Sequence, residues 1–398
     1  MNYLITGGEF NNKGAEAMTL TAMKNIYAND EKAHIYMFKG IVEPPFELNV
    51  PLSYVHVPHW MFLKLLGKSL KGYGWVCIKD VIKAFLPGYS NRPDSIKRTL
   101  TILKSIDYCI DVSGYAFGSK WSDEHNRNWL DWLSIAVKFS KSTYMMPQSF
   151  GPMEFEGDDI PNRARQVFGK CKRIYAREKS GMECLHKLGV ECIRTPDSVL
   201  LEKDFVAPLL IKNYKQYEET VELGRDRNVA IIPNGRLIDV GGVDRDGLMR
   251  FYSEVIDRLC VQYDIYLVAH AGEDLAICHE IKEKYAHNDA VRLIDHVMFS
   301  FNYEMFVRKM DFIIASRYHS IIHAYKEHTP AIILGWSDKY SGVAEDVCQQ
   351  DYLADIREND RALSIVERMG KNYESERVVI RERIKIIQEQ SCYDFLKE

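Results

Sequence analysis

The sequence predicts an α/β protein with two doubly wound, Rossmann-like domains and a cleft between them. Short apolar runs alternate with amphipathic helical stretches in both halves, and parallel strands require such crossover helices. The 398 residues exceed what one compact core usually supports. A charged, weakly periodic segment at residues 202–226 interrupts the alternation. We therefore expect domains at residues 1–215 and 216–360, and a helical segment at 361–398 that packs across both.

The first half opens with a strand, a glycine loop and a helix. An apolar run at residues 3–6 ends at Gly7 and Gly8, and apolar side chains then recur at helical spacing through residues 15–27. Turn or helix signals bound the apolar runs that follow. These runs predict strands at residues 34–38, 108–112, 142–146 and 173–176.

The second half repeats this pattern more regularly. Strands are predicted at residues 229–232, 265–269, 291–294, 312–315 and 331–334. Helices are predicted at residues 248–263, 275–285, 303–309 and 321–325, followed by a charged final helix from 361 to 395. Because ligands of doubly wound sheets gather at the carboxyl ends of the strands, the loops after these strands are the expected site.

Charge and composition exclude several classes of protein. The formal net charge of −4 and the pI near 6.3 give no general attraction to nucleic acid. Mean hydropathy is −0.27, and no signal peptide or long apolar run is evident. The nine cysteines are scattered without a C-x-x-C pair, which is typical of reduced thiols. We expect a cytoplasmic protein, with at most peripheral contact to the inner face of the cell membrane.

One segment has a different character from the rest. Residues 60–71 and 75–85 mix aromatic, aliphatic and basic side chains, and Asp80 alone opposes the positive charge of Lys79 and Lys83. Such a stretch suits an anionic membrane surface. Ordinary helices that pack on the first sheet are the commoner origin of such a stretch, and both interpretations stay open.

The sharpest constellation follows the strand at residues 312–315. The apolar run leads directly into Ser316, Arg317, His319 and Ser320 at a helix start. Exposed backbone N–H groups and the helix dipole attract anions there, and a guanidinium matches phosphate or carboxylate. The alternative is that Arg317 forms a structural ion pair and that His319 caps the helix. Spacing alone does not decide between an anion site and this structural role.

Motifs along almost the whole chain resemble, in order, those of the polysaccharide pyruvyltransferase family. The first is Gly7-Gly8 with Asn12-Lys13-Gly14-Ala15-Glu16-Ala17-Met18, followed by Met146-Pro147-Gln148-Ser149-Phe150-Gly151-Pro152, Ala176-Arg177-Glu178-Lys179-Ser180 and Pro196-Asp197. The last is Ser316-Arg317-Tyr318-His319-Ser320, with Thr329-Pro330-Ala331-Ile332-Ile333-Leu334 and Lys339 after it. The chain departs from the family at Ala15-Glu16 and at Ser113-Gly114-Tyr115, both on the acceptor side.

The resemblance implies a GT-B-like pair of domains and an enzyme that uses phosphoenolpyruvate as co-substrate. The enzyme would transfer the enolpyruvyl group of phosphoenolpyruvate to sugar hydroxyls, where it forms a cyclic ketal. The acceptor would be a bacterial-type capsular polysaccharide, an exopolysaccharide or a polyprenyl-pyrophosphate-linked precursor. No cofactor is required by this chemistry. The close histidine pairs, His56 with His59 and His319 with His323, do not follow a zinc-binding pattern, so we predict no metal.

The resemblance and the strand ends together suggest a role for each site residue. Donor binding is expected from Arg317, His319, Ser320, Lys339, Arg236 and His270. Acceptor binding is expected from Asn12, Gly14, Gly114, Tyr115 and Gln148. Catalysis is expected from His319 as the acid that protonates the donor's methylene carbon, from Arg317 as the stabiliser of the leaving phosphate, and from Glu16 or Asp111 as the base, with Glu178 a third candidate.

Several of these assignments have a structural alternative. Arg236 is equally typical of a solvated loop charge, and His270 can also cap a helix. Carboxylates such as Glu16, Asp111 and Glu178 are more often structural than catalytic. Two other functions also fit the predicted architecture. One is a glycosyltransferase that uses a nucleotide-sugar, and the other is a non-catalytic relative that binds a sugar or an anion.

Overall fold

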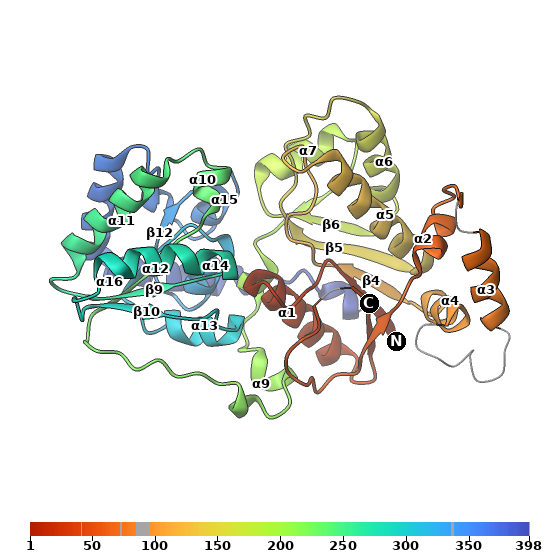
Figure 1. The fold of residues 1–398 in the computed structure, drawn as a ribbon, viewed down its shortest axis with the longest axis horizontal. Helices are drawn as coiled ribbons and strands as arrows, with labels where there is room; N and C mark the ends of the chain where they lie inside the picture. The colour runs from red at the N-terminus through yellow and green to blue at the C-terminus, as the bar shows by residue number, and fades with distance from the viewer. Residues whose placement is uncertain (41, 72–73, 85–94, 336–337, 398) are drawn as a thin grey trace.

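The chain forms two parallel sheets, each flanked by helices, in a computed structural model that describes residues 1–40, 42–71, 74–84, 95–335 and 338–397. The two domains lie side by side along the long axis of the molecule (Figure 1). The first sheet has the order β3-β2-β1-β4-β5-β6-β7, and the second has the order β10-β9-β8-β11-β12-β13. In both sheets the strand order reverses beside the first strand, as in doubly wound folds. The predicted fold class is therefore confirmed.

The strands are short and belong to one domain each. Those of the first sheet are β1 (Asn2–Thr6), β2 (His34–Phe38), β3 (Leu52–Val55), β4 (Tyr108–Asp111), β5 (Ser142–Gln148), β6 (Arg173–Ala176) and β7 (Ile193–Arg194). Those of the second sheet are β8 (Asn228–Ile232), β9 (Asp264–Val268), β10 (Val291–Ile294), β11 (Phe312–Ala315), β12 (Ala331–Leu334) and β13 (Leu353–Ala354).

Helices connect the strands and cover the sheets. The first domain contains α1 (Lys13–Asn29), α2 (His59–Leu65), α3 (Gly74–Ala84), α4 (Ile96–Lys104), α5 (Asp123–Phe139), α6 (Asp159–Phe168) and α7 (Lys179–Lys187). Two short helices follow, α8 (Ser198–Leu201) and α9 (Ala207–Leu210). The second part of the chain contains α10 (Arg236–Asp239), α11 (Arg245–Leu259), α12 (Leu275–Lys284), α13 (Ser300–Val307), α14 (Tyr318–Lys326), α15 (Asp338–Asp346) and α16 (Asn359–Ile387).

The alternation of side chains along β1 explains how helices come to cover both faces of the first sheet. Tyr3 and Ile5 are buried in one cluster with Met23 of α1. Leu4 faces the opposite way and is buried with Ala136 of α5. Successive side chains of a strand point to opposite faces, so a fully apolar strand needs an apolar helix on each side.

The apolar core continues from one domain into the other. One buried cluster contains Ile5 and Met18 of the first domain together with Tyr303, Ile313 and Ile321 of the second. Helix α1 supplies much of the contact, since it packs against α13 and α14. The two domains are therefore held together by a shared core as well as by polar contacts.

The end of the chain returns to the first domain. Val366 and Met369 of helix α16 are buried in the same apolar cluster as residues of the second sheet and of α11. The chain then reaches Phe395, whose ring stacks on Tyr144 of β5 with centroids 3.6 Å apart. The two termini consequently lie close to each other (Figure 1). In the described part of the chain, no helix combines the length and the apolar character needed to cross a bilayer.

The structure differs from the sequence prediction at the sheet edges and at the last helix. Strands β3, β7 and β13 were not predicted, and each is an edge strand of two to four residues. Such strands are too short to show a hydrophobic period. The last helix ends at Ile387 instead of 395, because the chain turns there to place Phe395 against the first domain.

Candidate active site

A cavity of about 350 Å³ lies between the two domains, and we call it the central cavity. Its first-domain lining consists of Asn12, Tyr115, Lys120 and Trp121. Its second-domain lining consists of Asn234, Arg236, Val240, His270, Glu273, Arg317, Tyr318, His319, Lys339 and Tyr340. The volume suits a small metabolite, and interdomain clefts of α/β proteins are where such ligands bind.

Four neighbouring strands of the second sheet bring the basic groups together. Arg317 follows β11, Arg236 follows β8, His270 follows β9, and Lys339 lies in the first turn of α15 after β12. These strands are adjacent in the order β9-β8-β11-β12 and run parallel. Because the carboxyl ends of parallel strands share one edge, all four side chains reach the same end of the sheet. All four of these residues line the central cavity.

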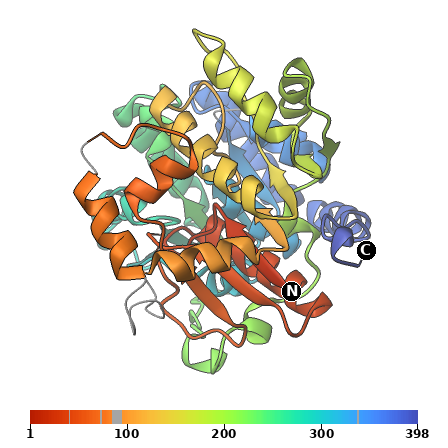
Figure 2. The same cartoon turned by 90° about the vertical axis from the view of Figure 1, so that its right-hand side faces the viewer.

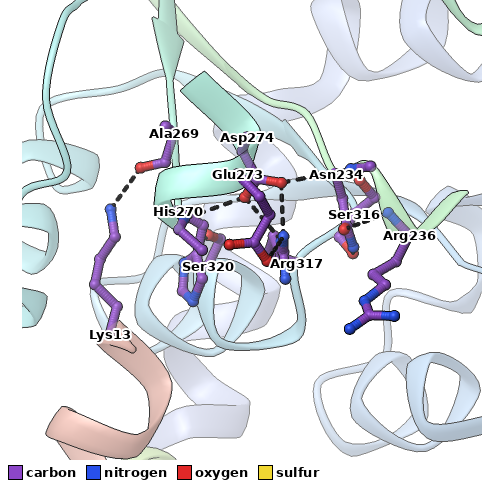
Figure 3. Close-up of polar contacts among 12 residues, drawn as sticks. Lys13, Asn234, Arg236, Ala269, His270, Glu273, Asp274, Ser316, Arg317 and Ser320 are labelled. Carbon is purple, nitrogen blue, oxygen red and sulfur yellow. Dashed lines mark hydrogen bonds and ion pairs between the residues drawn. The ribbon is translucent and has the colours of Figure 1, made fainter. Parts of the chain in front are cut away.

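Arg317 is held in place by two carboxylates (Figure 3). Its Nε donates to Asp274 Oδ2 at 2.8 Å, and its Nη2 donates to Asp274 Oδ1 at 2.6 Å and to Glu273 Oε1 at 2.8 Å. Burial disfavours the guanidinium charge, but these bonds outweigh burial and raise the pKa of Arg317. The predicted structural ion pair is thus present, in a residue that also lines the cavity. The pair fixes the orientation of a permanent cation at the cavity wall.

His319 lies in the first turn of α14 and contacts the first domain. A side chain at Gly14 would place its Cβ 2.2 Å from His319 Nδ1, so this approach requires glycine. The imidazole Nε2 is 3.6 Å from Asp197 Oδ2, which permits electrostatic attraction without a direct hydrogen bond. Burial lowers the pKa of His319, while Asp197 opposes this effect. Burial therefore favours the neutral imidazole when no ligand is bound.

Asp197 is itself fixed by a buried arginine. Arg177 Nη1 donates to Asp197 Oδ2, and the Arg177 guanidinium lies over the ring of Tyr318 at 4.6 Å from its centroid. Burial opposes ionisation of Asp197, but Arg177 outweighs it and holds the pKa of this carboxyl below its usual range. A permanent negative charge therefore faces His319 from behind the cavity.

Lys339 is surrounded by aromatic rings. Its Nζ is 5.7 Å from the ring centroids of Tyr115 and Tyr318 and 5.2 Å from that of Tyr340. Burial, together with the charge of Arg177, lowers the pKa of Lys339 to about 7. An anion in the central cavity would favour the charged form of this lysine.

Arg236 and His270 occupy opposite environments. Arg236 is exposed, and in Figure 3 its guanidinium lies apart from the Arg317 cluster. Asn234 fixes the loop, because its Nδ2 donates to Ser316 O at 2.8 Å. His270 is buried, its Nδ1 is 2.8 Å from Ser320 Oγ, and burial lowers its pKa well below the usual value. Ser320 therefore supports His270 from behind the cavity and does not line it.

The structure does not bring two predicted catalytic carboxylates to the central cavity. Glu16 accepts hydrogen bonds from Ser300 N at 2.8 Å and from Ser300 Oγ at 2.5 Å, across the domain boundary. Asp111 is buried and accepts bonds from Thr6 Oγ1 at 2.7 Å and from Gln148 Nε2 at 2.5 Å. Both carboxylates are satisfied by structural partners, so neither faces a ligand in this arrangement.

The remaining predicted acceptor residues divide in the same way. Asn12 and Tyr115 line the central cavity, and Asn12 also caps α1 by accepting from Gly14 N at 2.9 Å. Gly114 has a φ of +71°, which favours glycine, and its carbonyl accepts from Arg177 Nη2 at 2.7 Å. Gln148 is buried against Asp111. These last two shape the wall without lining it.

Glu178 lies at a second, smaller cavity of about 120 Å³, which we call the side cavity. Tyr115, Lys120 and Lys339 line both cavities, so the two adjoin. Glu178 Oε1 accepts from Ser149 Oγ at 2.8 Å, and burial raises the pKa of this carboxyl. Of the three carboxylates considered from the sequence, Glu178 is the one beside a cavity.

Comparison with protein families identifies the chain. The profile of a family described as polysaccharide pyruvyl transferase matches residues 12–338. The chain belongs to this family. A sequence comparison with curated proteins gives no match.

Solved structures share the GT-B fold of this pyruvyl transferase family member at low identity. UDP-GlcNAc 2-epimerase from Neisseria meningitidis, bound to UDP-GlcNAc, is 13% identical with a TM-score of 0.55, and 100% of each chain is covered. The corresponding epimerase from Methanocaldococcus jannaschii is 13% identical with a TM-score of 0.53 and 92% of each chain covered. The α,α-trehalose 6-phosphate synthase from Burkholderia multivorans is 9% identical with a TM-score of 0.53, covering 97% of this chain and 95% of its own.

Several cavity residues of this family member were not predicted from the sequence. Lys120 and Trp121 follow β4 in a long loop, and the Trp121 ring packs at 5.7 Å from that of Tyr115. Behind the cavity, Arg177 and Asp197 belong to recognised motifs, but the sequence did not predict that Arg177 pairs with Asp197 and that Asp197 in turn faces His319. The loop between β4 and α5 had to end at the cavity edge, and this topological signal could have identified Trp121.

Proposed function

We propose that the protein transfers the enolpyruvyl group of phosphoenolpyruvate to sugar hydroxyls and forms a cyclic pyruvate ketal. The observation that carries this proposal is that Arg317, Arg236, Lys339 and His319 line one cavity between the two domains. Phosphoenolpyruvate carries a phosphate and a carboxylate, and a protein of net charge −4 must hold them with local cations. No cofactor is needed for this reaction.

The second domain would bind the donor. Arg317 uses its Nε and Nη2 for the two carboxylates, which fix its orientation, and its Nη1 remains to donate to the phosphate or carboxylate of the donor. Arg236 and Lys339 add positive charge from the neighbouring loops. The first turn of α14 supplies backbone N–H groups and the positive end of a helix dipole.

His319 would act as the general acid. It gives a proton to the methylene carbon of the donor, which becomes a methyl group, and the central carbon becomes electrophilic. The negative charge of a bound donor raises the pKa of the imidazole, and Asp197 stabilises the resulting cation. One sugar hydroxyl attacks, phosphate leaves with the help of Arg317 and Lys339, and a second hydroxyl closes the ketal. One hydroxyl proton restores His319 and the other leaves with phosphate.

The first domain would hold the acceptor. Tyr115 and Trp121 provide aromatic surface at the central cavity, which suits the apolar face of a sugar ring. Glu178 is the base that we favour, because it lines the side cavity that adjoins the central cavity and because burial raises the pKa of its carboxyl. We propose acceptors from capsular polysaccharides, exopolysaccharides or their lipid-linked precursors.

The proposal is tested by mixing the protein with phosphoenolpyruvate and a panel of simple β-galactosides and polyprenyl-pyrophosphate sugars. Phosphate release that depends on the sugar, with a ketal detected by mass spectrometry, is the expected result. Turnover with a nucleotide-sugar alone would instead make the protein a glycosyltransferase. Tight binding of phosphoenolpyruvate without product from any acceptor would make it a non-catalytic relative.

A further inference from the structure

Helix α3 presents an uncovered apolar face. The side chains of Trp75, Ile78, Val81 and Ile82 are 84%, 53%, 42% and 58% exposed. At 100° per residue they fall within an arc of about 120° on one side of the helix. Lys79 and Lys83 continue the same surface on one side of this arc. We call these six side chains the α3 face.

The neighbouring helix shows that this exposure is specific to α3. Trp60 and Met61 of α2 are buried in a cluster with Val55 and Leu103. The predicted packing on the first domain is therefore what α2 does, whereas the apolar side chains of Trp75, Ile78 and Ile82 on α3 are more than half exposed. Residues 72–73 and Phe85 of the same segment lie outside the described residues.

The α3 face is placed at one end of the molecule. Helices α2, α3 and α4 form the end of the first domain that points away from the second domain (Figure 1). Seen along the long axis, α3 lies at the periphery of the first domain (Figure 2). A flat surface can therefore approach α3 without closing the central cavity.

The charge of this end is opposite to that of the whole protein. The described residues between 59 and 104 contain eight Lys and Arg against one Asp, although the formal net charge of the chain is −4. Lys64, Lys71 and Lys79 are exposed. An apolar arc with adjacent lysines is typical of helices that lie in the interface of an anionic bilayer.

We infer that the α3 face docks on the surface of an anionic lipid bilayer, with α3 parallel to the membrane plane. Trp75, Ile78 and Ile82 enter the boundary between headgroups and acyl chains, and the lysines contact lipid phosphates. A second copy of the chain is a poorer occupant, because two such strongly basic ends repel each other. This inference goes beyond the proposed transferase activity and requires no substrate.

The test is co-sedimentation of the full chain with vesicles, in the absence of any substrate. Vesicles of phosphatidylcholine mixed with phosphatidylglycerol should bind the protein at low salt, and vesicles of phosphatidylcholine alone should not. The variant with Lys79→Glu and Lys83→Glu should bind about tenfold more weakly or less. Trp75→Ser with Ile82→Ser should also lose about tenfold, because less apolar area enters the interface.

Matched controls separate this face from general stickiness. Val261 is 77% exposed in the second domain, so Val261→Ser should leave vesicle binding unchanged, as should Lys371→Glu on α16. Equal binding by the wild type and both double variants would overturn the inference. Self-association that depends on Trp75 in the absence of lipid would overturn it too, in favour of a second copy.

Discussion

The two walls of the central cavity are built on different principles. The second-domain wall carries Arg236, Arg317 and Lys339 on loops that directly follow buried strands. The first-domain wall carries Tyr115 and Trp121 on a long loop, and its buried carboxylates are occupied by structural hydrogen bonds. The comparison teaches that sheet topology fixes the positions of the basic side chains on the second-domain wall, whereas the facing wall depends on loop length and on contacts between domains.

The largest difference between the walls should appear in turnover when His319 is changed. His319→Gln removes the proposed acid, and kcat should fall by a factor of about 10² to 10⁴. The affinity for phosphoenolpyruvate should change less, because the cations remain. His287→Gln on an exposed site is the control and should leave kcat unchanged. A His319→Gln enzyme with near-normal kcat would remove the acid role.

The first-domain wall is tested next by Glu178→Gln. The loss of the proposed base should lower kcat by about 10² and leave the affinity for phosphoenolpyruvate within about threefold. Glu345→Gln, at an exposed ion pair with Lys179, is the matched control. An equal loss of donor affinity and turnover would place Glu178 on the donor side. That result would contradict the claim that the first-domain wall serves only the acceptor.

The pH dependence of donor binding sharpens the comparison. The pKa of Lys339 is lowered to about 7, so the lysine loses its charge as the pH rises through this value. The affinity for phosphoenolpyruvate should therefore fall as the pH is raised from 7 to about 9. Because one positive charge is lost, the expected decrease is about tenfold. Lys339→Arg keeps its charge over this range, and its affinity should vary less. Parallel pH profiles in calorimetry would exclude this role of Lys339.

The smallest effect is expected from Glu16→Gln, because a glutamine oxygen can still accept from Ser300. Turnover should stay within about threefold of the wild type. Burial raises the pKa of Glu16 to about 7 in the folded protein. The carboxyl therefore contributes fully to the free energy of unfolding when the pH is below the pKa of Glu16 in the unfolded chain, and this contribution is lost as the pH rises through about 7. The difference between the melting temperature of the variant and that of the wild type should therefore shift in favour of the variant between pH 5 and pH 8. A large loss of kcat would return Glu16 to the catalytic group.

The same contrast explains how much could be predicted from the sequence. The positions of Arg317, Lys339, Arg236 and His270 follow from the rule that loops after parallel strands share one edge. The positions of Glu16 and Asp111 could not be read in this way. Whether a carboxylate at a helix start faces a cavity depends on a partner such as Ser300, which is 284 residues away from Glu16 in the chain.

The fold was predictable for a related reason. Central strands such as β8 and β11 are continuous buried apolar runs, and such runs are visible in a single sequence. The edge strands β3, β7 and β13 gain their structure from pairing with a neighbour, not from an apolar period. The side cavity at Glu178 likewise arises from packing between loops and leaves no local pattern.

Calorimetric titration of phosphoenolpyruvate into the wild type, Arg317→Lys and Arg317→Ala tests the central claim most directly. The wild type should bind, Arg317→Lys should bind about tenfold more weakly because it lacks the planar fork, and Arg317→Ala about 100-fold more weakly. Arg245→Ala, at an exposed ion pair with Glu280, should bind like the wild type, and melting curves check that each variant is folded. Equal affinities in folded Arg317 variants and the wild type would contradict the account.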